Sequence, residues 1–308
     1  RIGIVAVKPF DLQVNGYAGV DFCASELEGK ELELACRALD EDGVDGVLAT
    51  IITDSLDRME AKLARLVNLR EQSALARKMV AGIHIEGPFI SPITGYVGAH
   101  PKEAVVEASL DGAKRLLDAA GGLTRLFTLA PECDPGMATT RFLSNEGVTV
   151  SAGHCDPALD TLNEAIENGL SMVTHFGNGC PVDMPRHDNV LQRFLHFRDH
   201  LWFCFIPDGA HVDFVALGNY IDFVGIERSI AVTDAICASR LGSGRYELSG
   251  MEIEVDEGGL ARKPGSSNLA GSTVTMPRMK KHLSEGLGFS DSEIEQLIDR
   301  NPRSAIER

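Results

Sequence analysis

Polar side chains that could bind a metal ion or move a proton recur at the ends of apolar runs in this sequence. Glu86 ends the run MVAGIHIE, His154 ends VTVSAGH and His175 ends SMVTH. A carboxylate at the end of a buried strand is costly unless something pairs with it. One carboxylate and two imidazoles form the ligand set of a catalytic zinc site with an open position for water. We therefore predict that Glu86, His154 and His175 bind a divalent cation.

Three further polar residues could act on a substrate beside such an ion. Asp234, in the segment AVTDA, is placed to take a proton from a water molecule and pass it to a leaving amine. His100 in GAHP and His211 in DGAHVD could polarise a substrate carbonyl or bind an anion. A divalent cation would lower the pKa of a nearby water molecule enough for it to attack a carbonyl at neutral pH. The set therefore indicates hydrolytic chemistry.

Each of these residues also has an ordinary structural interpretation. A lone histidine at a strand end is more often a hydrogen-bonded structural residue than a ligand. Glu86 could form a salt bridge or cap a helix, and Asp234 could be an N-cap. His84 points to the same side of its strand as Glu86, where it could support the ligand or simply pack in the core. The metal prediction depends on all the residues together.

Short apolar runs that alternate with amphipathic segments must position these residues. This alternation predicts a parallel sheet wrapped by helices, and eight such strands predict a TIM-type (β/α)₈ barrel. In that fold the active site lies at the carboxyl ends of the strands, where the polar residues above are found. The predicted strands cover residues 10–15, 46–52, 79–86, 125–131, 148–154, 171–175, 202–208 and 229–235.

We expect residues 1–308 to form one hydrolase domain, because barrels of this size occur as single units and no repeat or linker interrupts the chain. Residues 243–272 are rich in Gly and Ser and break the strand and helix alternation. They predict a hairpin insertion on the substrate side of the barrel.

The composition argues against several classes of protein. A formal net charge of −16 disfavours nucleic acid or an anionic membrane as a partner, because phosphate groups would be repelled. No apolar run is long enough to span a membrane, and the start RIGIVAVKPF lacks a signal-peptide cleavage pattern. The seven cysteines occur without a C-x-x-C pair, as reduced thiols would. We therefore expect a cytoplasmic protein that acts on a small molecule.

Six ordered blocks of the sequence, HIEGPF, VSAGH, VTHFGNG, PDGAHVD, AVTDA and LAGSTVTM, resemble the N-acetylglucosamine-6-phosphate deacetylases of the amidohydrolase superfamily. The resemblance spans roughly residues 11–308. It implies a metal-dependent barrel that removes acetate from a phosphorylated amino sugar, usually as a homodimer. The family's small β-sandwich domain, built from segments before and after the barrel, is expected to be mostly absent from this sequence.

The resemblance also implies roles for individual residues. It implies that Glu86, His154 and His175 bind the metal. It also implies that Asp234 is the catalytic acid and base and that His100 polarises the acetamide carbonyl.

Substrate binding is implied for a second group of residues. Asn178 and the backbone of Gly179 match the family's phosphate loop, with His211 nearby. Arg186 falls where an arginine reaches the phosphate from the partner subunit. Leu269 matches the loop residue that closes beside the sugar.

The first strand bears on the number of metal ions. Many amidohydrolases carry His-x-His there to hold a second ion, whereas this chain has Gln13-Val14-Asn15, as in single-metal members of the deacetylase family. We expect one divalent ion. Zn²⁺ is the expected metal, and Fe²⁺ or another transition ion suits the same ligand types.

The chain departs from the family pattern in one loop. Where the family usually reads H-L-F-N-A-M this chain reads HFGNGCP, and R-E-P-G is replaced by RHDN at residues 186–189. The altered loop motivates an alternative substrate, such as a cyclic amide or another N-acyl compound. A non-catalytic sugar-phosphate binder is a third hypothesis, but it has little need for a proton-transfer carboxylate such as Asp234 beside a metal.

Overall fold

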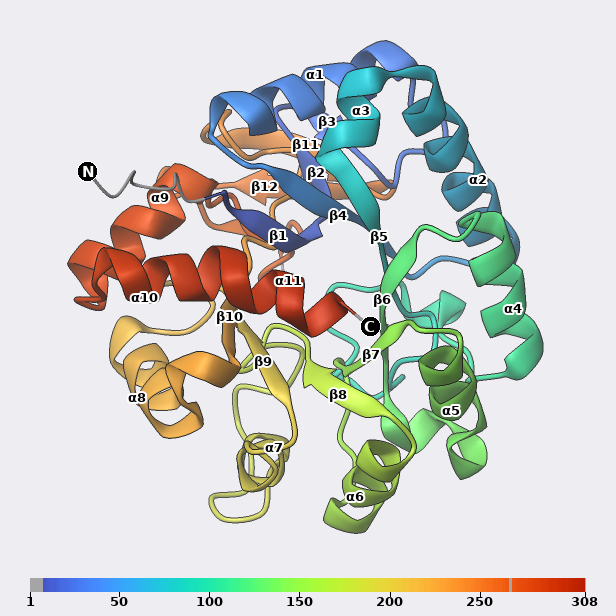
Figure 1. Cartoon of the computed structure of the whole chain (residues 1–308), viewed down its shortest axis with the longest axis vertical. Coiled ribbons are helices and arrows are strands. Elements are labelled where there is room, and N and C mark those ends of the chain that lie inside the picture. The colour runs from blue at the N-terminus through green and yellow to red at the C-terminus, as the bar shows by residue number, and fades with distance from the viewer. Residues whose placement is uncertain (1–7, 266–267, 308) are drawn as a thin grey trace, which may run out of the picture.

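Eight parallel strands, each hydrogen-bonded to the next, form the centre of the molecule, and helices surround them (Figure 1). The computed structural model describes residues 8–265 and 268–307. All eight predicted strands are present, so the predicted TIM-type barrel is confirmed. The strands are β1 (Phe10–Val14), β4 (Gly46–Ile52), β5 (Val80–Glu86), β6 (Thr124–Leu129), β7 (Thr149–Ala152), β8 (Leu170–Val173), β9 (Trp202–Phe205) and β10 (Ser229–Ala231).

The order of the strands in the sheet follows their order in the chain, from β1 through β4 to β10. The first and last strands meet just beyond their carboxyl ends, where Val14 and Ala235 form a parallel bridge. The backbone N–H of Asn15 donates to the carbonyl oxygen of Ala235 at 2.7 Å. This contact brings the end of β1 beside the segment that carries Asp234.

The helices pack around the strands because each buries one apolar face. In α1, the buried residues Leu32, Ala35, Cys36 and Leu39 recur with the spacing of one helical face. The helices are α1 (Gly29–Glu41), α2 (Leu56–Gln72), α3 (Ala74–Met79), α4 (Leu110–Ala119), α5 (Ala138–Asn145), α6 (Leu159–Glu167), α7 (Val190–His196), α8 (Phe214–Val224), α9 (Met276–Lys281), α10 (Asp291–Glu295) and α11 (Asn301–Ile306).

One end of the barrel is closed by the C-terminal helix α11, which crosses the near end of the strands in Figure 1. Ala305 of this helix belongs to the same apolar cluster as Leu12, Leu48 and Leu126 of the strands. The hydroxyl group of Thr149 donates to the carbonyl oxygen of Ala305 at 3.0 Å. The amino-terminal end of the barrel is therefore packed with apolar side chains, which leaves the other end for the site.

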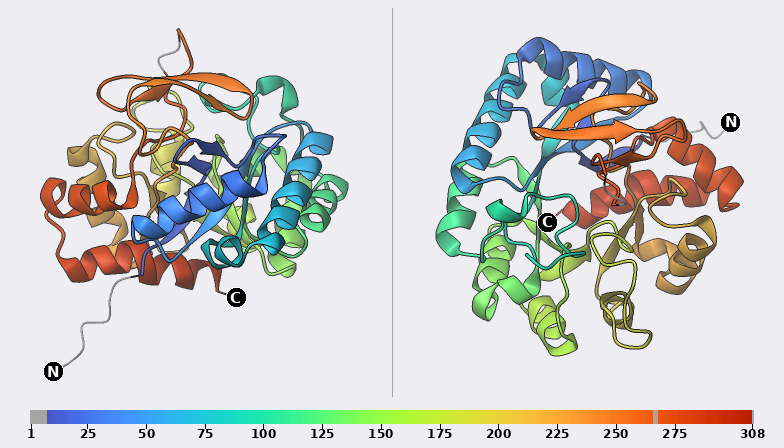
Figure 2. Two further views of the ribbon diagram at one scale, coloured as in Figure 1. Left: turned by 90° about the horizontal axis from the view of Figure 1, so that it is seen from above. Right: turned by 180° about the vertical axis from the view of Figure 1, so that it is seen from behind.

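The insertion lies over the opposite end of the barrel, as Figure 2 shows in its left view. Three antiparallel strands form it: β11 (Gly244–Leu248), β12 (Met251–Val255) and β13 (Ala261–Arg262). The buried ammonium group of Lys62 donates to Asp54 at 2.8 Å and to the Ser249 hydroxyl at 3.0 Å. This contact ties the tip of the β11–β12 hairpin to helix α2. Residues 266 and 267 of the predicted insertion lie outside the described residues.

A second small hairpin, β2 (Gly16–Tyr17) and β3 (Val20–Asp21), follows β1 and was not predicted from the sequence.

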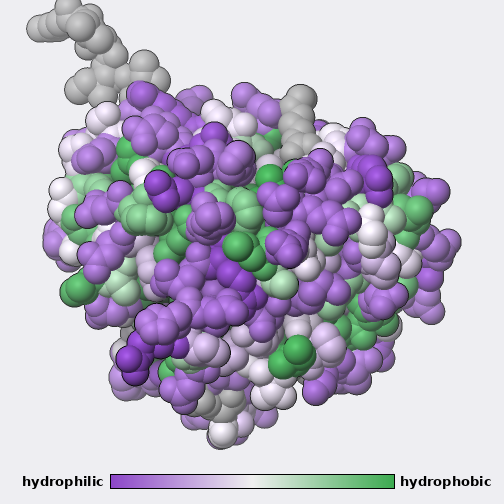
Figure 3. All heavy atoms as spheres, turned by 90° about the horizontal axis from the view of Figure 1, so that it is seen from below, coloured by the Kyte–Doolittle hydropathy of each residue, from purple (hydrophilic) through white to green (hydrophobic). Residues whose placement is uncertain are grey.

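Within residues 8–265 and 268–307, no helix combines the length and apolar character needed to cross a bilayer. The face drawn in Figure 3 is mostly hydrophilic, with hydrophobic residues interspersed.

The packing of the barrel interior predicts a large effect of Leu48→Ala. Leu48 is fully buried in the apolar cluster, so its truncation should leave a cavity and lower the free energy of unfolding by about 2–5 kcal/mol. Leu34→Ala in α1 is the matched control, because Leu34 is 52% exposed and should change stability by less than about 0.5 kcal/mol. Urea and thermal denaturation would measure both. Equal effects of the two substitutions would contradict the assigned core.

Candidate active site

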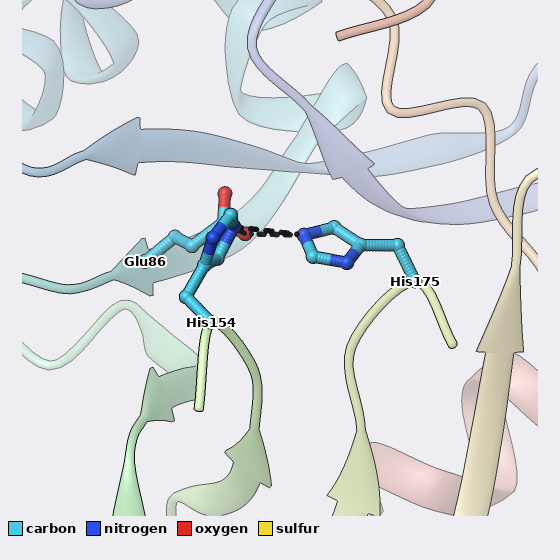
Figure 4. A group of neighbouring side chains, drawn as sticks. All are labelled: Glu86, His154 and His175. Carbon is cyan, nitrogen blue, oxygen red and sulfur yellow. Dashed lines mark hydrogen bonds and ion pairs between the residues drawn. The ribbon is translucent and has the colours of Figure 1, made fainter. Parts of the chain in front are cut away.

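The three predicted metal ligands converge at the carboxyl end of the barrel (Figure 4). The Nε2 atom of His175 lies 2.9 Å from Oε1 of Glu86 and 3.1 Å from Nε2 of His154. The Nε2 atom of His154 lies 3.3 Å from the same carboxylate oxygen. All three side chains are buried. The barrel thus brings together residues from β5 and from the loops after β7 and β8, as the predicted fold requires.

The chemistry of these three side chains fits a divalent cation. Nδ1 of His154 lies 2.9 Å from the carbonyl oxygen of Tyr96, which can only accept, so Nδ1 carries the proton and Nε2 presents a lone pair. The Nε2 lone pair of His154 and Oε1 of Glu86, 3.3 Å apart, repel each other, and a cation bound between them relieves this repulsion. Ligands at about 2.0–2.1 Å from a tetrahedral zinc ion would be separated by roughly 3.3 Å, close to the separations observed here.

The electrostatics of the cluster keep its carboxylate ionised. Burial alone would raise the pKa of Glu86, but the neighbouring imidazoles of His154 and His175 outweigh it and hold that pKa well below its usual value. The second oxygen of Glu86, Oε2, accepts a hydrogen bond from the amide group of Gln13 at 3.1 Å. Glu86 is therefore an oriented anion, as a metal ligand must be.

The backbone around the cluster is held in the left-handed region. His154, His175 and Asp234 have φ values of 53°, 31° and 50°, which residues other than glycine seldom adopt. Such conformations are costly and persist where surrounding contacts enforce them. Nothing in the sequence indicated this feature.

Two glycines pack against the imidazole of His154. A Cβ atom at Gly98 would lie 2.9 Å from Cε1 of His154, and one at Gly179 would lie 3.0 Å from its Nδ1. Both glycines also have φ near +60°. A larger residue at either position would therefore meet strain and displace the ring.

Asp234 lies beside the ligand cluster and lines the same cavity. Its Oδ1 atom accepts a hydrogen bond from the amide group of Asn15 at 2.6 Å. Burial raises the pKa of Asp234 to about 6, and the negative charge of Glu86 adds to this effect. The carboxylate is thus oriented, buried and close to the protonation range that a neutral-pH acid or base needs.

His100 approaches the cluster from the loop after β5. Its ring centroid lies 4.3 Å from that of His154, and its Nδ1 atom is 2.7 Å from the hydroxyl of Thr53. Burial is the main reason that the pKa of His100 falls to about 3. The neutral ring keeps one N–H group, whose position depends on the direction of the Thr53 hydrogen bond.

His211 is oriented by a nearby carboxylate. Its Nδ1 atom donates to Oδ2 of Asp208 at 2.6 Å, and the hydroxyl of Ser272 donates to the same oxygen at 3.1 Å. Burial opposes ionisation of Asp208, but the hydrogen bond from His211 and further backbone donors lower its pKa to about 2. The arrangement leaves Nε2 of His211 for another partner.

These residues surround one cavity of about 500 Å³. The cavity lining includes nine of the ten predicted site residues: Glu86, His100, His154, His175, Asn178, Gly179, His211, Asp234 and Leu269. Arg186 is exposed and does not line the cavity of its own chain, so its predicted role in a partner subunit stays a prediction.

Sequence reasoning assigned no role to the side chains that orient the site. Gln13 and Asn15 were recognised as polar residues ending β1, but their contacts with Glu86 and Asp234 join positions 73 and 219 residues apart. Thr53 carried no signal. The spacing of Asp208 and His211, three residues apart after a strand, could have indicated their pairing.

Comparison with proteins of known function identifies relatives that match nearly the whole chain. The chain is 32% identical to the N-acetylglucosamine-6-phosphate deacetylase of Bos taurus over 310 residues, which cover 98% of this chain and 74% of that protein. It is 30% identical to the enzyme of the same name from Bacillus subtilis (strain 168), with 94% of this chain and 72% of that protein covered. No protein-family model matches the chain.

Solved structures agree with these relatives. An aspartate-to-alanine mutant of the Mycobacterium smegmatis N-acetyl-D-glucosamine-6-phosphate deacetylase, solved in complex with N-acetyl-D-glucosamine-6-phosphate, superposes with a TM-score of 0.88 at 26% identity over 97% of this chain and 77% of that chain. The Pasteurella multocida enzyme gives a TM-score of 0.86 at 26% identity, with 97% and 76% covered. The resemblance seen in the sequence is confirmed. The chain belongs to the N-acetylglucosamine-6-phosphate deacetylase family, within the amidohydrolase superfamily.

Proposed function

We propose that this protein hydrolyses the acetamide group of N-acetyl-D-glucosamine 6-phosphate to acetate and D-glucosamine 6-phosphate, with one divalent ion held by Glu86, His154 and His175. The observation that carries the proposal is the convergence of this ligand set with Asp234 and His100 around one cavity, in a chain related to deacetylases over nearly its full length. A divalent ion at this position would polarise the amide carbonyl and lower the pKa of a water molecule.

Asp234 is proposed as the proton-transfer group. It takes a proton from the attacking water, and it delivers that proton to the amide nitrogen as the bond between carbonyl carbon and nitrogen breaks. The hydrogen bond from Asn15 orients the carboxylate for both steps. Burial raises the pKa of Asp234, which makes its carboxylate a stronger base toward the attacking water.

His100 is proposed to stabilise the negative charge that develops on the carbonyl oxygen. The Thr53 hydroxyl lies 2.7 Å from Nδ1 of His100 and 3.3 Å from the backbone carbonyl oxygen of Glu86. Donation along the shorter contact leaves the proton of the neutral ring on Nε2, where it can point toward the substrate. The lowered pKa of His100 supports a neutral ring at physiological pH.

Asn178, the backbone of Gly179, His211 and Leu269 are proposed to bind the sugar phosphate, because all line the cavity. Three finer inferences accompany this assignment. We infer Zn²⁺ as the ion from the ligand types, a homodimer in which Arg186 reaches the partner's site, and a cytoplasmic location, which the free cysteines support.

Removal of the proton-transfer group predicts a selective loss of turnover. Asp234→Asn should lower kcat for acetate release by about 10²–10⁴-fold while metal content stays unchanged, because Asp234 is not among the three ligands. Asp222→Asn, at an exposed position of α8, is the matched control. Assayed acetate release and elemental analysis would measure both properties. Retained activity in Asp234→Asn would remove this residue from the mechanism.

Loss of a metal ligand predicts changes that do not depend on catalysis. Glu86→Gln should bind zinc at least about 10²-fold more weakly, because it removes the only anionic member of the ligand set. In the unsubstituted protein, an ion at 100 times its Kd should add about 2.7 kcal/mol to the free energy of unfolding, and chelation should remove it. Zinc titration and thermal denaturation would report both effects.

Glu26→Gln is the matched control for this substitution, because Glu26 is exposed and far from the ligand set in sequence. It should bind zinc as the unsubstituted protein does. Unchanged zinc affinity in Glu86→Gln would contradict the assigned site.

Substrate discrimination separates the proposal from its alternative. A phosphate-binding site should favour N-acetylglucosamine 6-phosphate over N-acetylglucosamine by at least about 10²-fold in kcat/KM. Acetate release from each sugar by the zinc-loaded protein would be compared, with an N-acetyl amino acid as a third substrate. A higher kcat/KM for the amino acid would support the alternative substrate class.

A further inference from the structure

One strongly basic side chain lies in the wall of the active-site cavity. Among the cavity-lining residues that the structure describes, Arg262 is the one whose side chain stays cationic at every physiological pH. It is the last residue of β13 in the insertion, and it did not emerge from the sequence as a candidate. The chain as a whole carries a net charge of −16, so the positive charge of Arg262 is opposite in sign to the average charge of the protein.

The cavity is chemically different at its floor and at its rim. Glu86 is 2% exposed and His175 4% exposed, so the ligand cluster forms the floor. The Arg262 side chain is 35% exposed, which places it at the rim. A substrate with an amide at one end and a phosphate at the other can reach the floor with its amide only if its phosphate points toward the rim.

The guanidinium group is held in place by its neighbours. Nη1 of Arg262 donates to Oδ2 of Asp256 at 3.1 Å. Oδ1 of Asp256 in turn accepts the backbone N–H groups of Gly258 and Leu260 at 2.8 and 2.9 Å. A guanidinium carries five N–H donors, so it can hold Asp256 and an oxyanion together. The side chain is therefore fixed in advance of binding.

The position of Arg262 relative to the sugar site is set by the backbone. Arg262 forms an antiparallel bridge with Leu269, which also lines the cavity. The tip of the preceding hairpin is tied to the barrel through Lys62 and Ser249. The strand that carries Arg262 is thus paired with β12 on one side and bridged to Leu269 on the other.

We propose that Arg262 binds the 6-phosphate group of the substrate from within the same chain and thereby makes the site selective for phosphorylated amino sugars. This inference rests on the function proposed above and names a residue that determines its specificity. It is independent of Arg186, whose predicted contact requires a partner subunit.

Arg262→Met tests the proposal, because it keeps most of the unbranched stem of the side chain and removes its charge. Titration calorimetry of the zinc-loaded protein would measure binding of glucosamine 6-phosphate and of glucosamine, and kcat/KM would be measured for the two acetylated sugars. Arg262→Met should weaken binding of the phosphorylated sugar by at least about tenfold, because it removes charge-assisted hydrogen bonds. Binding of glucosamine should change by less than about twofold. Arg262→Lys should retain an intermediate affinity.

Two control variants separate phosphate binding from a structural role. Arg245→Met lies on β11 of the same hairpin, where its side chain is 72% exposed, and should leave both affinities unchanged. Asp256→Asn removes the anionic anchor but keeps the charge of Arg262, so it should weaken phosphate binding less than Arg262→Met does.

Equal weakening of both sugars by Arg262→Met, or equal losses in Asp256→Asn and Arg262→Met, would show that Arg262 acts through the hairpin and would overturn the proposal. Equal affinity of the unsubstituted protein for the two sugars would also overturn it. Failure of that protein to release acetate from either acetylated sugar would contradict the proposed function instead. The titrations with glucosamine 6-phosphate would still decide the role of Arg262.

Discussion

The burial of one carboxylate, that of Glu86, is the constraint on which the rest of the structure depends. A charge at the end of a central strand is tolerated only with partners on all sides. Those partners come from the far side of the barrel, through His154 and His175, and from β1, through Gln13. A closed barrel is what brings residues from β1, β5, β7 and β8 to one point. The barrel architecture therefore supplies the partners that the buried charge of Glu86 requires.

The ends of the barrel divide stability from chemistry. Apolar side chains and α11 fill one end, and they supply the rigid packing that holds strained residues at the other. The left-handed backbone at His154, His175 and Asp234 persists because β-strands fix the chain just before each residue. Gly98 and Gly179 then approach the His154 ring as closely as only glycine can. The positions of the site residues therefore depend on apolar packing at the opposite end of the barrel.

The sequence was sufficient for the barrel and for most of the candidate site, for a physical reason. Strand periodicity is local, and the polar residues that end each strand must meet once the strands are parallel. The pairings of Asn15 with Asp234 and of Thr53 with His100 could not be found in this way, because they depend on side-chain directions across the closed barrel. Arg262 was missed for a related reason: its strand is two residues long, and its position is set by pairing with β12 and with Leu269.

An acidic protein that binds a phosphorylated sugar needs positive or hydrogen-bond-donating groups close to the bound phosphate. The net charge of −16 repels a phosphate at long range, but salt at physiological strength screens exposed charges beyond about 8 Å. The electrostatic interaction of a bound anion is therefore dominated by the cavity wall. Gly179, His211 and Arg262 line this wall. The anionic residues of the cavity, Glu86 and Asp234, are confined to its floor, where a cation would balance them. With Arg262 in its proposed role, the separation of charge between floor and rim would orient the substrate as well as attract it.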